Sequence, residues 1–125
     1  MLRLLKVVIG GALVFGVLAD AGDARAASAS GQTVQQLASD CGSKDQSEEL
    51  LCMTYFMGFV DGLEAAASLY GANVPICYPE SGLSISDWML TFRLWASIHP
   101  EDAKDAAPAG VLMAMVERFP CKTKP

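Results

Sequence analysis

The fold of this 125-residue chain is constrained most strongly by its four cysteines, Cys41, Cys52, Cys77 and Cys121. They follow an N-terminal segment typical of an export signal, and about 99 residues remain once residues 1–26 are removed. A domain of this size buries only a modest core, so cross-links add stability that packing alone does not supply. An oxidising compartment favours disulfides, whereas a zinc site favours close C-x-x-C pairs, which this sequence lacks. We therefore expect two disulfides.

The export signal has three parts. Two basic residues precede an apolar run of 13 residues, and small residues that fit an A-x-A cleavage pattern follow it. These parts are Arg3 and Lys6, Val7–Ala19, and Ala24–Ala26 with Ala27–Ala29. A membrane-spanning helix needs about 20 apolar residues, so the run is too short for an anchor. We expect cleavage near Ala26 to Ala29, one domain over residues 30–122, and no stable membrane association after cleavage.

The mature chain is acidic. Cleavage after Ala26 removes three basic and two acidic residues, which leaves six Lys or Arg residues against twelve Asp or Glu residues, a net charge of about −6. Nucleic acids and anionic membranes attract basic surfaces. The charge balance therefore argues against both as partners.

Periodicity and capping residues predict two helices in the first half of the domain. Thr33 to about Asp40 has a short amphipathic pattern. Ser47 is a good N-cap, two glutamates after it suit the positive end of a helix, and an apolar pattern runs from Leu50 to Tyr70. Gly71 then ends this long helix.

Two further helices are predicted in the second half. Ser84 and Asp87 have the spacing of a capping box for a helix over about Ile85–Ile98, and the His99-Pro100 pair breaks it. After a short turn at Glu101–Lys104, Asp105 can cap a fourth helix that ends at Pro120. Its expected buried stripe is Val111, Leu112, Met115, Val116 and Phe119. Since no strand-like alternation competes, we predict an all-α fold, a small four-helix bundle stapled by disulfides.

Helix geometry separates the three possible disulfide pairings. Cys52 lies near the start of the long helix and Cys77 lies six residues past its end, so about 18 helical residues hold them roughly 27 Å apart. A disulfide needs Cα atoms within about 7 Å. Cys41 lies at the same end as Cys52, and antiparallel alternation brings Cys121 to the end that holds Cys77. We therefore predict Cys41–Cys52 and Cys77–Cys121.

The long helix and the third helix carry more apolar surface than a small bundle can bury. From Leu50 to Val60 the only polar groups are Thr54 and the Tyr55 hydroxyl. A helix that is apolar all round is normally buried all round. Either a second copy or a partner covers the excess, or the core is simply rich in large side chains.

Several short motifs, taken in order, resemble the Rap1a/Tai family of immunity proteins of bacterial type VI secretion systems over about residues 33–121. They are Cys52, Tyr55, Gly58, Asp61 and Gly62 on the long helix, the CYPESG loop of residues 77–82 with the capped helix after it, the His99-Pro100 break, and the ending Phe119-Pro120-Cys121. The resemblance implies a small helical periplasmic protein, often a homodimer. It also implies that the protein binds and blocks a cognate peptidoglycan amidase toxin.

The family motif residues on the long helix also have structural interpretations. Gly58 and Gly62 lie four apart on one face, where missing side chains let another helix come close. Asp61 is either solvent-facing or bonded to a neighbouring helix end or loop amide, and we favour such a structural bond over a toxin contact. The Tyr55 hydroxyl is expected at the edge of the bundle.

The loop from Tyr78 to Leu83 is the best candidate for reaching a toxin's active-site groove. Cys77 fixes its base, and a proline and a glycine shape a protruding turn. The candidate toxin-binding residues are Tyr78, Pro79, Glu80 and Ser81, of which Glu80 offers a carboxylate to a polar catalytic site. The alternative is an ordinary turn that leads into a helix cap.

Enzyme chemistry finds little support in the sequence. His99, the only histidine, precedes a proline at a helix end, where an imidazole commonly caps carbonyls, and no serine or cysteine nucleophile can be assigned to it. We expect no catalytic residue, no metal and no cofactor. The main alternative function is a periplasmic acid-stress chaperone, or holdase, whose apolar faces are exposed when carboxylates are protonated. A structural subunit of an envelope assembly is a third possibility.

Overall fold

The computed structural model describes residues 31–122, so the expected export signal lies outside the described residues. In this part of the chain the elements are α1 (Val34–Gly42), α2 (Gln46–Tyr70), α3 (Ile85–Ile98), the 3-10 helix η1 (Pro100–Asp102) and α4 (Ala107–Arg118). Only two isolated β-bridges accompany these helices, and no strand forms within residues 31–122. The predicted all-α fold with four helices is confirmed.

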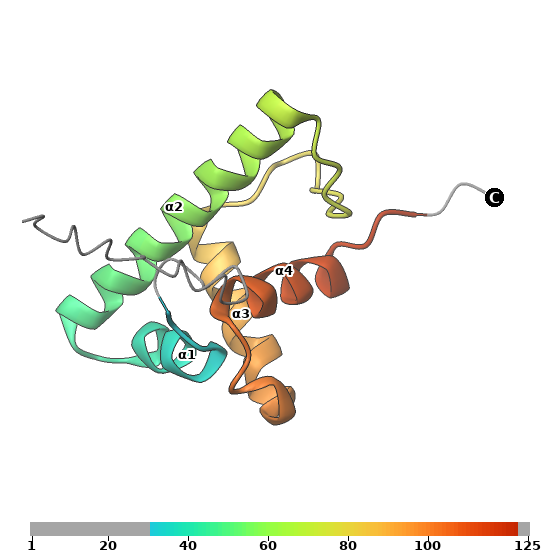
Figure 1. Cartoon of the computed structure of the whole chain (residues 1–125). Coiled ribbons are helices and arrows are strands. Elements are labelled where there is room, and N and C mark those ends of the chain that lie inside the picture. The colour runs from blue at the N-terminus through green and yellow to red at the C-terminus, as the bar shows by residue number, and fades with distance from the viewer. Residues whose placement is uncertain (1–30, 123–125) are drawn as a thin grey trace, which may run out of the picture.

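The helices pack around α1 and α3. Each of these two contacts the other and both remaining helices, whereas α2 packs mainly against α1 and α3. The C-terminal half of α2 extends beyond the other helices, and the following loop returns toward the start of α3 (Figure 1). As a result, the second half of α2 and this loop are open on several sides.

The start of α2 differs from the prediction, because Asp45 and not Ser47 is the N-cap. The Asp45 carboxylate accepts hydrogen bonds from the backbone N–H groups of Ser47 at 2.8 Å and Glu48 at 3.3 Å. A carboxylate is favoured over a hydroxyl at the positive end of a helix. The helix therefore begins at Gln46. At its other end Gly71 adopts a left-handed conformation with φ of 62°, as predicted.

The predicted capping box of α3 is present. The hydroxyl of Ser84 accepts from the Asp87 backbone N–H at 3.2 Å, and the Asp87 carboxylate accepts from the Ser84 N–H at 2.8 Å. The Ser84 hydroxyl also donates to this carboxylate at 2.7 Å. Hydrogen bonds from the Ser84 hydroxyl and then from its backbone lower the pKa of Asp87. The box is therefore present at neutral pH and is lost only as acid protonates Asp87 below its ordinary pKa.

The start of α4 also differs from the prediction, since Asp105 does not cap it with its side chain. Ala106 is the N-cap and makes no side-chain hydrogen bond. Instead, the Ala107 N–H donates to the Gln32 carbonyl at 2.9 Å, and the Val34 N–H donates to the Asp105 carbonyl at 2.9 Å. Backbone pairing with the segment before α1 thus satisfies groups that a capping side chain would otherwise serve.

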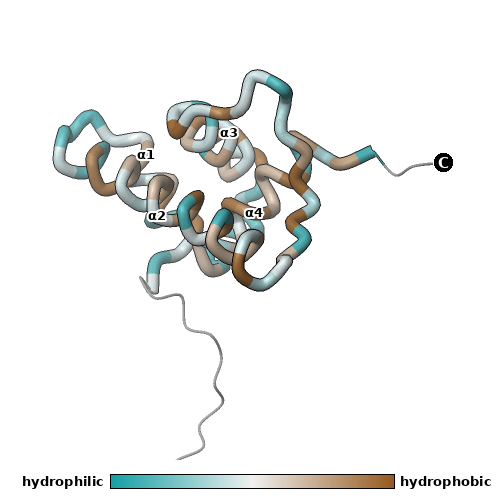
Figure 2. Tube along the Cα trace, turned by 90° about the horizontal axis from the view of Figure 1, so that it is seen from above, coloured by the Kyte–Doolittle hydropathy of each residue, from teal (hydrophilic) through white to brown (hydrophobic). Residues whose placement is uncertain are grey.

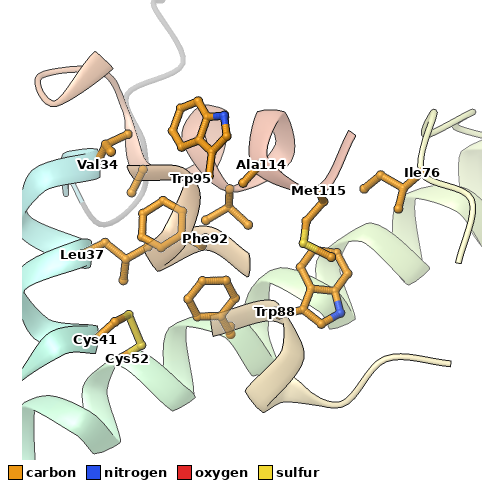
Figure 3. Packing of buried hydrophobic residues seen from close by; sticks show 13 residues of the cluster. Val34, Leu37, Cys41, Cys52, Ile76, Trp88, Phe92, Trp95, Ala114 and Met115 are labelled. Carbon is orange, nitrogen blue, oxygen red and sulfur yellow. A yellow bond between two sulfur atoms is a disulfide. The ribbon is translucent and has the colours of Figure 1, made fainter. Parts of the chain in front are cut away.

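The core contains large side chains from all four helices. Phe56 of α2 packs on Phe92 of α3 with ring centroids 5.7 Å apart, and both rings are fully buried. Trp88 and Trp95 are also buried (Figure 3). Two residues of the buried stripe expected on α4, Val111 and Met115, are buried. The other three are only partly buried: Leu112, Val116 and Phe119.

Gly110 of α4 marks the tightest helix contact among the glycines of the described chain. A Cβ at this position would overlap the Val34 Cγ2 atom and lie 3.2 Å from the Trp95 Cζ3 atom. Only a residue without a side chain lets α4 approach α1 and α3 this closely. This packing role of Gly110 was not predicted from the sequence.

Both predicted disulfides are present. Cys41 and Cys52 join the end of α1 to the first turns of α2 with a Cα–Cα distance of 5.0 Å, and both are buried (Figure 3). Cys77 and Cys121 have Cα atoms 4.9 Å apart and are exposed. This second bridge ties the loop after α2 to the chain after α4, next to a hydrogen bond from the Cys77 N–H to the Phe119 carbonyl at 2.9 Å.

Candidate functional site

The candidate toxin-binding loop is exposed and has a fixed base. Tyr78, Pro79, Glu80 and Ser81 are all exposed. The Gly82 N–H donates to the Pro79 carbonyl at 2.8 Å, which closes the turn, and Gly82 has a φ of 73° that suits glycine. The Cys77–Cys121 disulfide holds one end of the loop. The capping box of α3 holds the other end.

Tyr78 has a defined position within this loop. Its ring lies against the indole of buried Trp88, with centroids 6.1 Å apart, while half of the side chain stays exposed. Burial, and then the negative charge of Glu64 on α2, raise the pKa of the Tyr78 phenol. The phenol is therefore neutral at physiological pH and available as a hydrogen-bond donor. An anchored aromatic ring with a polar tip is typical of residues that dominate protein interfaces.

A groove of about 520 Å³ between α3 and α4 adjoins the loop. Its apolar lining includes exposed residues of α3, of which Leu94 and Ile98 are 60% and 72% exposed. Leu83, the last residue of the candidate loop, also lines the groove. The loop and the groove therefore form one surface, which we call the loop–groove surface. The apolar surplus predicted for the third helix lies here.

The second apolar surface is the side of α2 that faces away from α1 and α3, which we call the outer face of α2. It includes Leu51 and Leu69, which are 63% and 74% exposed, and Met57. By length and composition alone α2 could cross a membrane, and 11% of the apolar window is buried. Figure 2 colours hydrophobic residues brown along the helices and the connecting chain. Because Leu51, Met57 and Leu69 are exposed, the apolar surplus predicted for the long helix lies at the surface of the described chain.

Three of the family motif residues lie on the outer face of α2. Gly58 and Gly62 are exposed, and a Cβ at either would meet nothing within 4 Å. Asp61 is exposed between them, and its carboxylate makes no hydrogen bond within residues 31–122. The close approach predicted at these glycines is therefore not made by the described part of this chain. Asp61 is solvent-facing there and does not make the structural bond that we favoured.

Tyr55 differs from its prediction. Its hydroxyl is buried and has no hydrogen-bond partner within the described chain, instead of lying open at the bundle edge. The ring stacks on Phe59 with centroids 6.4 Å apart and meets Phe56 edge-on. Burial raises the pKa of Tyr55 to about 12. The residue contributes mainly aromatic packing beneath the outer face of α2.

His99 does not cap carbonyls with its ring, contrary to the prediction. Its backbone N–H ends α3 by donating to the Trp95 carbonyl at 3.1 Å, while its ring stacks on the Trp95 indole with centroids 4.6 Å apart. The ring nitrogens face carboxylates of Glu101, Asp102 and Glu117. This cluster was not predicted. Glu101 and Asp102 lie close to His99 in the sequence, whereas Glu117 comes from α4. All four cysteines are in disulfides, so no free thiol lies beside the imidazole.

Together these features define a small, disulfide-linked helical domain whose two exposed apolar surfaces suit it for binding other proteins. Residues 33–121 match the family model of Rap1a immunity proteins, and the chain belongs to this family. Its membership confirms the resemblance seen in the sequence. No curated protein and no solved structure gives a significant match. Family membership implies an immunity protein that binds a secreted toxin.

Proposed function

We propose that this protein is a periplasmic immunity protein that binds and neutralises a cognate peptidoglycan amidase toxin delivered by a type VI secretion system. The match of residues 33–121 to the Rap1a immunity family carries this proposal. The signal expected over residues 1–26 would export the domain of residues 30–122, and two disulfides suit an oxidising periplasm. An inhibitor in that compartment meets the toxin where its peptidoglycan substrate lies.

The loop–groove surface is the part of the molecule that we assign to the toxin. The loop is exposed and fixed at both ends, so it can enter an active-site groove without a large loss of conformational entropy. Glu80 would present its carboxylate, and Tyr78 its neutral phenol, to polar groups of the catalytic site. The apolar groove between α3 and α4 would receive a hydrophobic side chain of the toxin beside that contact.

Affinity capture at pH 7 with the oxidised mature protein is the first test of this function. A single peptidoglycan hydrolase retained at near-equal stoichiometry, and inhibited when both proteins are purified and mixed, is the expected result. If no hydrolase is bound at pH 7 and a mixed set of clients is bound at about pH 3, the immunity function is wrong. The holdase alternative would then be favoured, because the outer face of α2 already offers exposed apolar side chains.

Substitution of Tyr78 by alanine is expected to weaken binding of the captured toxin at least tenfold. Central aromatic anchors at interfaces commonly contribute about 2 kcal/mol or more, and tenfold corresponds to about 1.4 kcal/mol. Isothermal titration calorimetry measures the change. Tyr70→Ala is the matched control, because Tyr70 is 85% exposed at the end of α2, outside the loop. Equal affinities for the Tyr78→Ala variant and the parent protein would remove this loop from the toxin interface.

We also propose that two copies of the protein pair through the outer face of α2. The open space at Gly58 and Gly62 would let a helix of the second copy approach closely, and exposed leucines beside them would then be buried. A homodimer would cover the apolar surplus of α2 and leave the loop–groove surface free.

Arginine at position 62 is expected to convert this dimer into a monomer. The Gly62→Arg side chain would occupy the space that a second copy needs, while nothing in the described chain lies within 4 Å to be disturbed. Sedimentation equilibrium reports the mass, and circular dichroism confirms that the helices are kept. Ala109→Arg, at an exposed position of α4, is the control. A monomeric parent protein, or a Gly62→Arg variant that stays dimeric, would contradict the assignment.

A further inference from the structure

The imidazole of His99 faces carboxylate oxygens on both sides. Its Nδ1 atom lies 3.1 Å from Glu101 Oε1 and 3.9 Å from Asp102 Oδ2, and its Nε2 atom lies 3.5 Å from Glu117 Oε2. A neutral imidazole has one N–H and one lone pair. One nitrogen of the neutral ring can therefore donate to a carboxylate, as at the Nδ1–Glu101 hydrogen bond, whereas the other turns its lone pair toward negative charge unless a proton or a metal ion lies between them.

We propose that His99, Glu101 and Asp102 bind a divalent transition metal ion of the zinc class. One ligand atom from each residue lies within 4.8 Å of the other two. Zinc–ligand bonds of about 2.0–2.1 Å place neighbouring ligand atoms of a tetrahedron about 3.3 Å apart. The observed distances of 3.1 and 3.9 Å from His99 Nδ1 lie on either side of this value. Because Glu101 and Asp102 are at least partly exposed, small side-chain rotations complete the arrangement.

The surroundings of the imidazole support this assignment independently of the three ligands. The Oε2 atom of Glu117, from α4, lies 3.5 Å from Nε2, so a small movement of this exposed side chain would let it accept a hydrogen bond from Nε2–H when Nδ1 binds the metal. Metal-binding histidines commonly donate their second ring N–H to a carboxylate in this way, which fixes the tautomer and raises ligand basicity. The stack on Trp95 fixes the plane of the ring. The site is thus built by α3, η1 and α4 together.

The donor set selects the class of ion. One imidazole nitrogen with two carboxylate oxygens suits borderline ions such as Zn²⁺, whereas Ca²⁺ and Mg²⁺ prefer oxygen donors only. No thiolate of the chain competes, because all four cysteines form disulfides. Water would complete the coordination on the exposed side. A bound ion would join the end of α3 to η1 and, through Glu117, to α4, so it would stabilise the folded chain by mass action.

Zinc titration of the tag-free, oxidised protein tests the site directly. The chain has a single histidine, so long-range ¹H–¹⁵N NMR shows one imidazole. On addition of ZnCl₂ at pH 7.5 we expect the Nδ1 signal to shift to the metal-bound range while Nε2 stays protonated. Calorimetry should give one Zn²⁺ per chain. Imidazole signals that do not change when zinc is added, or coordination through Nε2, would overturn the proposal. This test needs no variant.

Variants then separate the ligands from their support. His99→Asn should abolish calorimetric binding, and Glu101→Gln or Asp102→Asn should weaken it at least tenfold. Glu117→Gln should weaken binding about 10-fold to 100-fold, because it removes only the carboxylate that orients the ring. Asp105→Asn is the control, since Asp105 is an exposed carboxylate outside the cluster. Stoichiometric zinc binding that survives in the folded His99→Asn protein would place the ion elsewhere and refute the site.

Discussion

Valine at position 110 is expected to destabilise the domain by about 3 kcal/mol, the upper part of the usual range for overpacking. The first added carbon of Gly110→Val would already overlap Val34 Cγ2, and it would lie 3.2 Å from Trp95 Cζ3 and 3.6 Å from Phe92 Cε2. Replacing glycine within a helix gains at most a few tenths of a kcal/mol with valine. The steric overlap outweighs this gain, so the substitution lowers the free energy of unfolding.

The overlap is not easily relieved by movement of α1. The Val34 N–H donates to the Asp105 carbonyl and the Ala107 N–H donates to the Gln32 carbonyl, both at 2.9 Å, so the start of α1 is fixed to the start of α4. A shift that makes room for the new side chain must stretch these hydrogen bonds. Hydrogen bonds left unsatisfied in this way cost about 1–3 kcal/mol when buried.

Urea denaturation of the oxidised protein, followed by circular dichroism, measures the effect. The midpoint should fall while the slope is unchanged, because the surface exposed on unfolding is nearly the same. Ala109→Val is a matched control on the neighbouring, exposed position of α4, and helix propensity predicts a loss of only about 0.6 kcal/mol. Similar losses in the two variants would show that helix propensity, and not packing at Gly110, controls the result.

The sequence predicted local features of this fold well. The Ser84–Asp87 box, the Gly71 stop and the four helices depend on residues near one another in the chain, so spacing alone specifies them. The disulfide pairing was also predicted, because a long helix keeps Cys52 far from Cys77 whatever the rest of the chain does. Because a long helix is rigid, its predicted length also fixes the distance between residues at its two ends.

Features that depend on neighbours distant in sequence were missed. Gly58 and Gly62 have the expected spacing for helix packing, yet the close approach within the described chain is at Gly110, where Val34 and Trp95 lie against the backbone. The spacing of the two glycines identifies a helix face without side chains, but it does not identify which helix packs against that face. The prediction that Asp105 caps α4 was wrong for a related reason. The Gln32 carbonyl, distant in sequence, accepts a hydrogen bond from the Ala107 N–H at the start of α4.

The candidate site was predicted in part. The loop of residues 78–81 was expected to protrude, and it is exposed with a fixed base. The groove beside it was not predicted, because it requires α3 and α4 to lie next to each other at Leu94 and Phe119. Glu117 was missed as a neighbour of His99 for the same reason, whereas Glu101 and Asp102 lie only two and three positions from His99. Glu117 is 18 positions away in sequence, and only the packing of α4 brings it to the ring.

Removal of the Cys41–Cys52 disulfide is expected to cost about 4 kcal/mol in the Cys41→Ala, Cys52→Ala double variant. The two cysteines are separated by 11 residues, for which the chain-entropy model gives about 3 kcal/mol. Both cysteines are buried, so truncating them to alanine adds about 1 kcal/mol for lost contacts and the space left behind. Such a loss is a large share of the 5–15 kcal/mol typical of a whole domain.

The Cys77–Cys121 pair provides the comparison that separates these two contributions. Its longer separation of 44 residues gives about 4 kcal/mol from chain entropy, but both cysteines are exposed, so Cys77→Ser with Cys121→Ser should add no packing cost. Urea denaturation under non-reducing conditions should therefore give similar losses for the two double variants despite their different loop lengths. A loss for the Cys41–Cys52 pair about 1 kcal/mol smaller would mean that burial contributes nothing. In the parent protein, mild reductant should open Cys77–Cys121 first, because the buried sulfurs become accessible only when α1 separates from α2.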